Sequence, residues 1–225
     1  MTDEELNLPP RRDSQPGEGV ARNTDRMEFF ADAVFAIAFT LSAVEIPLPE
    51  SGPGFAANLL ALWPGYLAYI LSALVIGIYW AQHHFSGAIY RMTGHYFLLA
   101  TILFLMTIGF IAFPTRVFAE NLLEPEARET AAIYYTVALA ATAFAWWIKW
   151  RTGLSHGHVD KRLEPAYVAR LNRRYTISAA LMAGAAVLSL ARWEIGLGLA
   201  ALVTLAYLRA PETPVYRTEA PEVDE

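Results

Sequence analysis

Residues 26–46 of the chain read RMEFFADAVFAIAFTLSAVEI. This stretch is long and apolar enough for one helix to cross the hydrocarbon core of a bilayer, which takes about 20 residues. It also carries charged side chains: Arg26, Glu28 and Asp32 near its start and Glu45 near its end. Charge inside a membrane span is expensive, so it marks positions that pair with a partner or serve a function. The stretch therefore predicts a transmembrane helix with a functional role.

The composition of the whole chain is that of a polytopic membrane protein. Of its 225 residues, 55% are hydrophobic and only 17% are charged, which is more apolar surface than a soluble domain of this size buries. The chain has no cysteine, which excludes disulfides, thiol chemistry and Cys-based zinc sites. No basic patch with interleaved aromatic residues predicts a nucleic-acid partner. No phosphate loop, nucleophile elbow or catalytic carboxylate pair predicts an enzyme or an organic cofactor.

The chain divides into one helical membrane domain and two polar ends. Residues 25–209 predict an all-α domain of six transmembrane helices per subunit. Residues 1–24 and 210–225 are rich in proline and acidic residues, which predicts disordered tails. The six apolar segments are 27–47, 58–86, 95–115, 129–150, 172–190 and 193–209.

Basic residues set the expected orientation. With six spans and a cytoplasmic N-terminus, all of the 17 Lys and Arg residues except Arg116, Arg128 and Arg192 fall on inner segments. This 14 to 3 split follows the positive-inside rule. We therefore expect both termini in the cytoplasm. The long inner loop 151–171 is expected either to begin an amphipathic helix at Pro165 or to be a solvated linker.

The first helix carries one wholly apolar stripe. At 100° per residue, Asp32 points away from this stripe. The stripe either packs on neighbouring helices or lipid, or meets its symmetry mates around an axis and constricts a conduction path. From the residues alone, packing is the more common outcome. The stripe consists of Phe30, Val34, Ile37, Leu41 and Val44.

Three short motifs favour the pore interpretation of this stripe over simple packing. Residues 26–32, RMEFFAD, resemble the Arg-x-x-x-Phe-Ser-Asp signature of the prokaryotic relatives of lysosomal transmembrane protein 175, a potassium channel. Residues 80–84, WAQHH, resemble the Trp-x-x-His-His end of that family's second helix, and residues 113–115, FPT, resemble the motif that closes its third. The motifs come in the family's order. One departure is Ala31, where the signature has serine, and this change removes a hydrogen bond worth about 0.6 to 2 kcal/mol in a membrane.

The resemblance implies a homotetramer in the bacterial inner membrane, with the first helices around a central pore and potassium as the permeant ion. It places the pore constriction at Ile37, Leu41 and Val44, on the same apolar stripe. Thr40 borders this stripe. Its hydroxyl is expected either to contact a passing ion or to bond back to the carbonyl of Ala36.

The resemblance also implies a polar network behind the pore helix. We expect it to contain Arg26, Asp32, Trp80 and at least one of His83 and His84, because a carboxylate in the membrane needs a partner. Successive side chains on a helix diverge by 100°, so one of the two histidines is expected to face inward. The alternative for Arg26 is snorkelling to lipid headgroups.

Other functions remain open at this point. Adjacent histidines do not have the i, i+4 spacing of a helical metal site, so no metal is predicted. Asp32 with His83 or His84 is also suited to a proton channel or a proton-coupled transporter, although transporters usually show internal repeats and broken helices. A membrane scaffold that conducts nothing is the third possibility. The main prediction is a potassium-selective channel whose partners are its own copies, the lipid bilayer and potassium ions.

Overall fold

The computed structural model describes residues 24–210 and 212–217. Within these ranges the chain forms eight α-helices and no β-strand, only the isolated antiparallel bridges Tyr90–Val159 and Leu163–Tyr216. The predicted all-α class is therefore confirmed, while the predicted N-terminal tail lies, apart from Thr24, outside the described residues. The helices are α1 (Asp25–Val44), α2 (Phe55–Ala61), α3 (Trp63–Gly87), α4 (His95–Phe110), α5 (Ala112–Glu120), α6 (Pro125–Ser155), α7 (Pro165–Ser189) and α8 (Trp193–Ala206).

Two expected single helices are each divided by a proline. The segment 58–86 is interrupted at Leu62, between α2 and α3, and the segment 95–115 is interrupted at Ile111, between α4 and α5. Proline has no backbone N–H, so Pro64 and Pro114 cannot donate to the carbonyl four residues earlier. Each helix break lies between the proline and the residue four positions before it.

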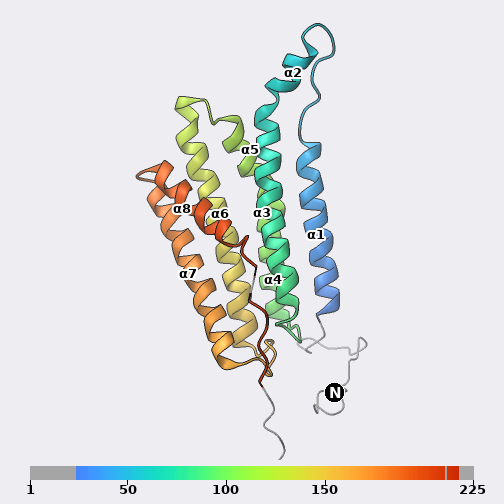
Figure 1. Ribbon diagram of the computed structural model, residues 1–225, viewed down its shortest axis with the longest axis vertical. Helices are drawn as coiled ribbons and strands as arrows, with labels where there is room; N and C mark the ends of the chain where they lie inside the picture. The colour runs from blue at the N-terminus through green and yellow to red at the C-terminus, as the bar shows by residue number, and fades with distance from the viewer. Residues whose placement is uncertain (1–23, 211, 218–225) are drawn as a thin grey trace, which may run out of the picture.

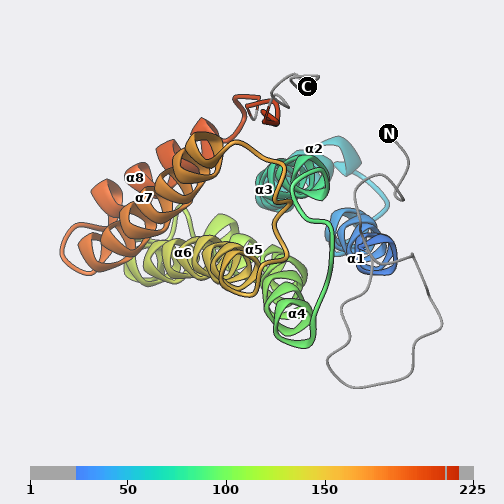
Figure 2. The same ribbon diagram turned by 90° about the horizontal axis from the view of Figure 1, so that it is seen from below.

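The helices run side by side along the long axis of the molecule (Figure 1). Helix α6 packs against α4, α5, α7 and α8, whereas α1 packs mainly against α3 and α4. Viewed along the bundle, α1 therefore lies at its edge (Figure 2). Among the described residues, one face of α1 therefore has no partner from the same subunit.

The core lies between α3, α4, α6 and α7 and is rich in aromatic rings. The Phe104 ring packs edge-on against the Trp146 ring, with the ring centroids 5.1 Å apart. Such pairs contribute about 0.5–1.5 kcal/mol beyond the area that they bury. The largest fully buried apolar side chains are Trp150, Tyr167, Phe97, Phe104, Ile76, Ile108, Ile111, Leu163 and Met182.

Four helical segments are long and apolar enough to cross a membrane: 25–44, 63–87, 95–120 and 125–155. Helix α7 coincides with the fifth predicted span but is not among them, and α8 has 14 residues, fewer than the roughly 20 that a helix perpendicular to the bilayer needs. The membrane character of the chain agrees with the prediction, and the count of six spans stays a prediction.

The loop after α6 is shorter than expected. Helix α6 extends to Ser155 and α7 begins at Pro165, so the connection covers residues 156–164 rather than 151–171. The helix start expected at Pro165 is present, but it opens one continuous helix instead of a separate amphipathic segment. Proline suits the first turn because the N–H groups there have no partner within the helix.

This loop is fixed by the carboxylate of Asp160. The guanidinium of Arg162 donates to it at 2.7 Å, and Arg91 from the α3–α4 connection lies 3.8 Å away. The backbone N–H of Asp160 donates to the carbonyl of Ile89 at 2.8 Å. Through Arg91 and this backbone bond, Asp160 links the α6–α7 connection to the α3–α4 connection.

The segment 212–217, inside the range expected to be a tail, lies extended against the same loop. The N–H of Glu164 donates to the carbonyl of Val215, and the N–H of Arg217 donates to the carbonyl of Arg162, both at 2.8 Å. Backbone pairing of this kind gives an extended segment a fixed position.

Candidate functional site

Helix α1 has one face that is buried in the bundle and one that is open. Residues at spacings of three and four place the buried face against α3 and α4, as expected for one side of a helix. The residues expected at the constriction lie on the open face, where Ile37 is 56% exposed, Leu41 is 54% exposed and Val44 is 76% exposed. The buried face consists of Met27, Ala31, Phe35, Ala38 and Ser42.

Thr40 lies on the exposed side of α1, beside this stripe. Its hydroxyl donates to the carbonyl of Ala36 at 2.9 Å and lies 3.2 Å from the carbonyl of Ile37. Of the two expectations for Thr40, the structure contains the bond back to the helix. The oxygen of this hydroxyl can still accept a bond, because donating its proton leaves the lone pairs free.

The carboxylate of Asp32 has a partner on α3. The indole N–H of Trp80 donates to its Oδ1 atom at 3.2 Å. On the next turn of α3 the imidazole of His84 stacks on the same indole, with the ring centroids 5.8 Å apart. Three of the expected network residues therefore lie together, and they connect α1 to α3.

His83 faces the other way, as the 100° angle between neighbours predicts. Its side chain is in the core, 3% exposed, between the ring of Phe35 at 5.6 Å and the ring of Phe104 at 6.4 Å. Its Nε2 atom has no hydrogen-bond partner among the described residues. His83 thus packs in the core and does not join the Asp32 contact.

Arg26 lies apart from these groups. It is exposed, and it forms no hydrogen bond or ion pair with any residue in the described ranges. Six residues separate it from Asp32, which is about 9 Å along a helix axis. This placement corresponds to the snorkelling alternative rather than to a contact with Asp32.

A residue that the sequence analysis did not single out is Lys149 on α6. Its side chain is 1% exposed, and its Nζ atom has no hydrogen-bond partner among the described residues. Four aromatic rings enclose the ammonium group. Its Nζ atom lies 4.9 Å from the ring centroid of Trp146, and the other three rings are those of Tyr90, Phe97 and Phe104, at 5.5–6.0 Å.

Lys149 is one of the 14 basic residues assigned to inner segments by the positive-inside pattern, but its ammonium group lies inside the bundle. The one local signal in the sequence is Trp146, three residues before Lys149 on the same helix face; the other three rings come from residues far away in the chain. An ammonium over several rings gains cation–π attraction when it is removed from water.

The fold also shows the surroundings of Ala31, which stands where the family signature has serine. Ala31 is completely buried in the core, so a hydroxyl there would need a partner across the helix interface. Ser42, the polar residue on this buried face, donates to the carbonyl of Phe39 at 2.9 Å. Within the described part of the chain, no three His, Asp or Glu side chains are grouped so as to hold a metal ion.

The fold and this site define a helical membrane protein whose first helix has an apolar face without a partner among the described residues and a hydrogen bond from Trp80 to Asp32 that joins it to α3. Residues 26–112 match the family model described as endosomal/lysosomal potassium channel TMEM175. A crystal structure of a lysosomal potassium-selective channel TMEM175 homolog from Chamaesiphon minutus superposes with a TM-score of 0.70 at 30% identity, covering 84% of this chain and 98% of that one.

Two curated relatives are named potassium channels. The one from Chamaesiphon minutus is 40% identical over 121 residues, 52% of this chain and 60% of the relative. The one from Streptomyces collinus is 40% identical over 134 residues, 57% of this chain and 65% of the relative. The chain therefore matches somewhat less than two thirds of each. Together with the structural match, these findings show that the chain belongs to the TMEM175 family, whose described members here are channels and not enzymes.

Proposed function

We propose that this protein is a potassium-selective channel, a homotetramer in which four copies of α1 surround the pore. The observation that carries the proposal is the open apolar face of α1. Ile37, Leu41 and Val44 are each more than half exposed in the single subunit, although they belong to a helix whose other face is packed into the bundle. The names of the relatives support potassium as the ion.

Rings of these three residues would make a constriction without charged or carbonyl ligands. A narrow apolar ring empties of water and closes, and a small helix rotation lets water return. Potassium holds its hydration shell less tightly than sodium, so it enters such a ring more easily. Thr40, one residue before Leu41, supplies the nearest hydroxyl oxygen to the passing ion.

The Asp32–Trp80 contact is the proposed support for this wall. It joins the pore helix to α3 at a distance of 3.2 Å, and His84 covers the indole from one side. Since α1 packs mainly against α3 and α4, this bond is positioned to set the rotation of α1. We assign Asp32, Trp80 and His84 to holding α1, and His83 to packing behind it.

The proposed channel domain is 25–209, in the bacterial inner membrane, with both termini in the cytoplasm. The start of α1, the α6–α7 connection and the last described residues all lie at the same end of the bundle (Figure 1). That end carries Arg91, Arg162 and Arg170, as expected for a cytoplasmic side.

The proton-relay alternative has less support. A relay from Asp32 toward the histidines would have to pass Trp80, whose indole nitrogen only donates and cannot accept a proton. His83, the buried histidine, contacts Phe35 and Phe104 and not Asp32.

Reconstitution in planar bilayers tests the function. Purified protein should give steady current with a reversal potential that follows the potassium gradient at constant pH. Current that needs a pH gradient would favour the proton-coupled alternative, and no current under either gradient would favour the scaffold.

The natural absence of cysteine allows a direct test of the pore wall. The variant Leu41→Cys should lose current when a thiol reagent or Cd²⁺ is added, because soft thiolates bind Cd²⁺ and four of them would meet near the axis. The matched control is Phe39→Cys, which is also exposed but lies 200° around the helix. If the two variants were equally sensitive, α1 would not line the pore. Native mass spectrometry tests the oligomeric state and should find four subunits.

A further inference from the structure

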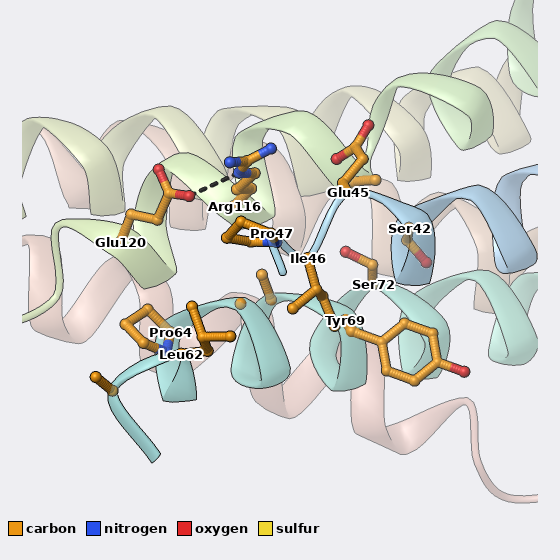
Figure 3. A pocket seen from close by; sticks show the side chains of 14 residues that line it. Ser42, Glu45, Ile46, Pro47, Leu62, Pro64, Tyr69, Ser72, Arg116 and Glu120 are labelled. Carbon is orange, nitrogen blue, oxygen red and sulfur yellow. Dashed lines mark hydrogen bonds and ion pairs between the residues drawn. The ribbon is translucent and has the colours of Figure 1, made fainter. Parts of the chain in front are cut away.

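A pocket of about 160 Å³ lies behind the end of α1, between the α1–α2 connection, α3 and α5 (Figure 3). Since one water occupies about 30 Å³ of liquid, the space equals that of about five waters. It is smaller than the pockets that take drug-sized ligands. No function has been given to it so far. Its lining includes Ser42, Glu45, Tyr69, Ser72 and Arg116.

Ser72 provides the first sign of a ligand. Its side chain is 1% exposed, and its hydroxyl has no hydrogen-bond partner among the described residues. In Figure 3 the hydroxyl oxygen points to the side where Glu45 and Pro47 line the pocket. Buried hydroxyls are almost always bonded, so this one calls for a polar group inside the pocket.

Charge provides the second sign. The guanidinium of Arg116 is engaged by the carboxylate of Glu120 at 2.6 Å and also feels the charge of Glu45, which forms no ion pair of its own within the described ranges, so two carboxylates face one guanidinium. The pocket therefore has one acidic group left over. This charge excludes an anion as its occupant and favours a cation.

The walls decide what kind of cation fits. Between the polar groups the pocket is lined by Ile46, Leu62, Pro64 and Ala68. Hard metal ions take about six to eight oxygen ligands, and the side chains of Ser42, Glu45 and Ser72 offer fewer than that. An organic cation places its charged head at the carboxylate and its hydrocarbon part on the apolar side chains, the usual division in small-molecule sites.

We propose that this pocket binds a small organic ammonium group. The ammonium donates to the carboxylate of Glu45 and to the hydroxyl of Ser72, and a short hydrocarbon chain lies against Ile46 and Pro64. The site is independent of the proposed conduction path, because Ser42 lines the pocket from the face of α1 opposite to the constriction residues. The ammonium comes either from a free amine or from the ethanolamine headgroup of a lipid.

Calorimetric titration of the purified full-length protein in detergent at pH 7 tests the binding. The probes are propylamine, propanol and propionate, which share size and differ in head charge: positive, neutral and negative. We expect saturable binding of propylamine, at least tenfold weaker binding of propanol and none of propionate, since hydrogen bonds to a charged group are the stronger ones. Equal binding of propylamine and propanol, or no binding of propylamine, would overturn the proposal.

Variants locate the site. Glu45→Gln should weaken propylamine binding about tenfold or more, and Ser72→Ala about threefold to tenfold. The matched control Glu50→Gln removes an exposed acidic group from the same connection, outside the pocket, and should bind as the natural protein does. Helical content and elution volume of each variant confirm that it folds. Glu45→Gln with unchanged affinity would place the amine elsewhere.

Lipid nanodiscs distinguish the two sources of the ammonium. In discs of phosphatidylglycerol alone, propylamine should bind as it does in detergent. If phosphatidylethanolamine added to the discs weakens the apparent affinity for propylamine, the lipid headgroup competes for the site. If the affinity is unchanged, the site takes the free amine. Loss of propylamine binding in phosphatidylglycerol discs would show that binding in detergent does not represent the membrane protein.

Discussion

The indole N–H of Trp80 lies 3.2 Å from the carboxylate of Asp32 and is the hydrogen bond that joins α1 to α3. Both residues are partly open to the surroundings, so the bond adds less than a fully buried one would. Interhelical hydrogen bonds in membranes average about 0.6 kcal/mol in double-mutant cycles. The proposed role of this contact is therefore to fix the rotation of α1, because its contribution to the stability of the fold is small.

Breaking this contact should impair conduction before it unfolds the protein. We expect Asp32→Ala and Trp80→Phe each to lower the current strongly while lowering the unfolding free energy by about 0.6 kcal/mol. Current in planar bilayers and equilibrium unfolding in detergent measure the two effects, and the double variant should add little to either single one. Full current from an intact Asp32→Ala tetramer would refute the supporting role of Asp32.

A polar group in the proposed constriction should increase leak. The change Ile37→Asn keeps the side chain similar in size but attracts water, so the ring no longer empties and partly hydrated sodium passes. We expect a reversal potential shifted toward that of an unselective pore in a potassium/sodium gradient. The control Phe39→Asn lies on another face of α1 and should keep the selectivity. Unchanged reversal potentials in Ile37→Asn would count against the constriction.

The caged ammonium of Lys149 should be replaceable by an apolar side chain. Removing a charge from water costs several kcal/mol, and the four surrounding rings return about 2 kcal/mol. Methionine has a similar length and keeps the ring contacts. We therefore expect Lys149→Met to raise the free energy of unfolding by about 1 kcal/mol, as replacements of buried charges do.

Thermal unfolding in detergent measures the effect at Lys149. Lys161→Met serves as the control, because Lys161 is exposed and its replacement should change stability little. A large loss of stability in Lys149→Met alone would mean that the ammonium contributes more than its ring contacts explain.

The connection between α6 and α7 should lose stability in acid. Burial raises the pKa of the Asp160 carboxyl, but the hydrogen bonds and charge of Arg162, with Arg91 nearby, outweigh it and hold the pKa below its usual value. A carboxyl with a lowered folded-state pKa stabilises the fold above its unfolded pKa, near 4. That contribution disappears as the pH falls through the folded-state pKa.

The variant Asp160→Asn tests this. At pH 7 it should lower the free energy of unfolding by about 1.5 kcal/mol, because hydrogen bonds to a charged acceptor are lost. The difference from the natural protein should shrink as the pH is lowered below 4. A difference that stays constant with pH would show that the carboxylate charge is not what stabilises the loop.

Residues 26–46 determined much of this protein by sequence alone. Helical periodicity depends on neighbours three and four residues away, so the apolar stripe of Ile37, Leu41 and Val44 and its opposition to Asp32 are set locally. The short motifs placed the chain in its family for the same reason. The positions of the proline breaks also follow from local chemistry, although the prediction of unbroken spans overlooked them.

The tertiary structure decided everything that depends on a second helix. Nothing local pairs Asp32 with Trp80, leaves Arg26 apart, or makes His83 a core residue and His84 a stacking one. The same holds for the aromatic cage of Lys149, assembled from the α3–α4 connection, α4 and α6, and for the pocket around Ser72. These arrangements arise from packing between residues far apart in the chain, where side-chain shape and burial choose the partner, and no periodicity in one segment encodes that choice.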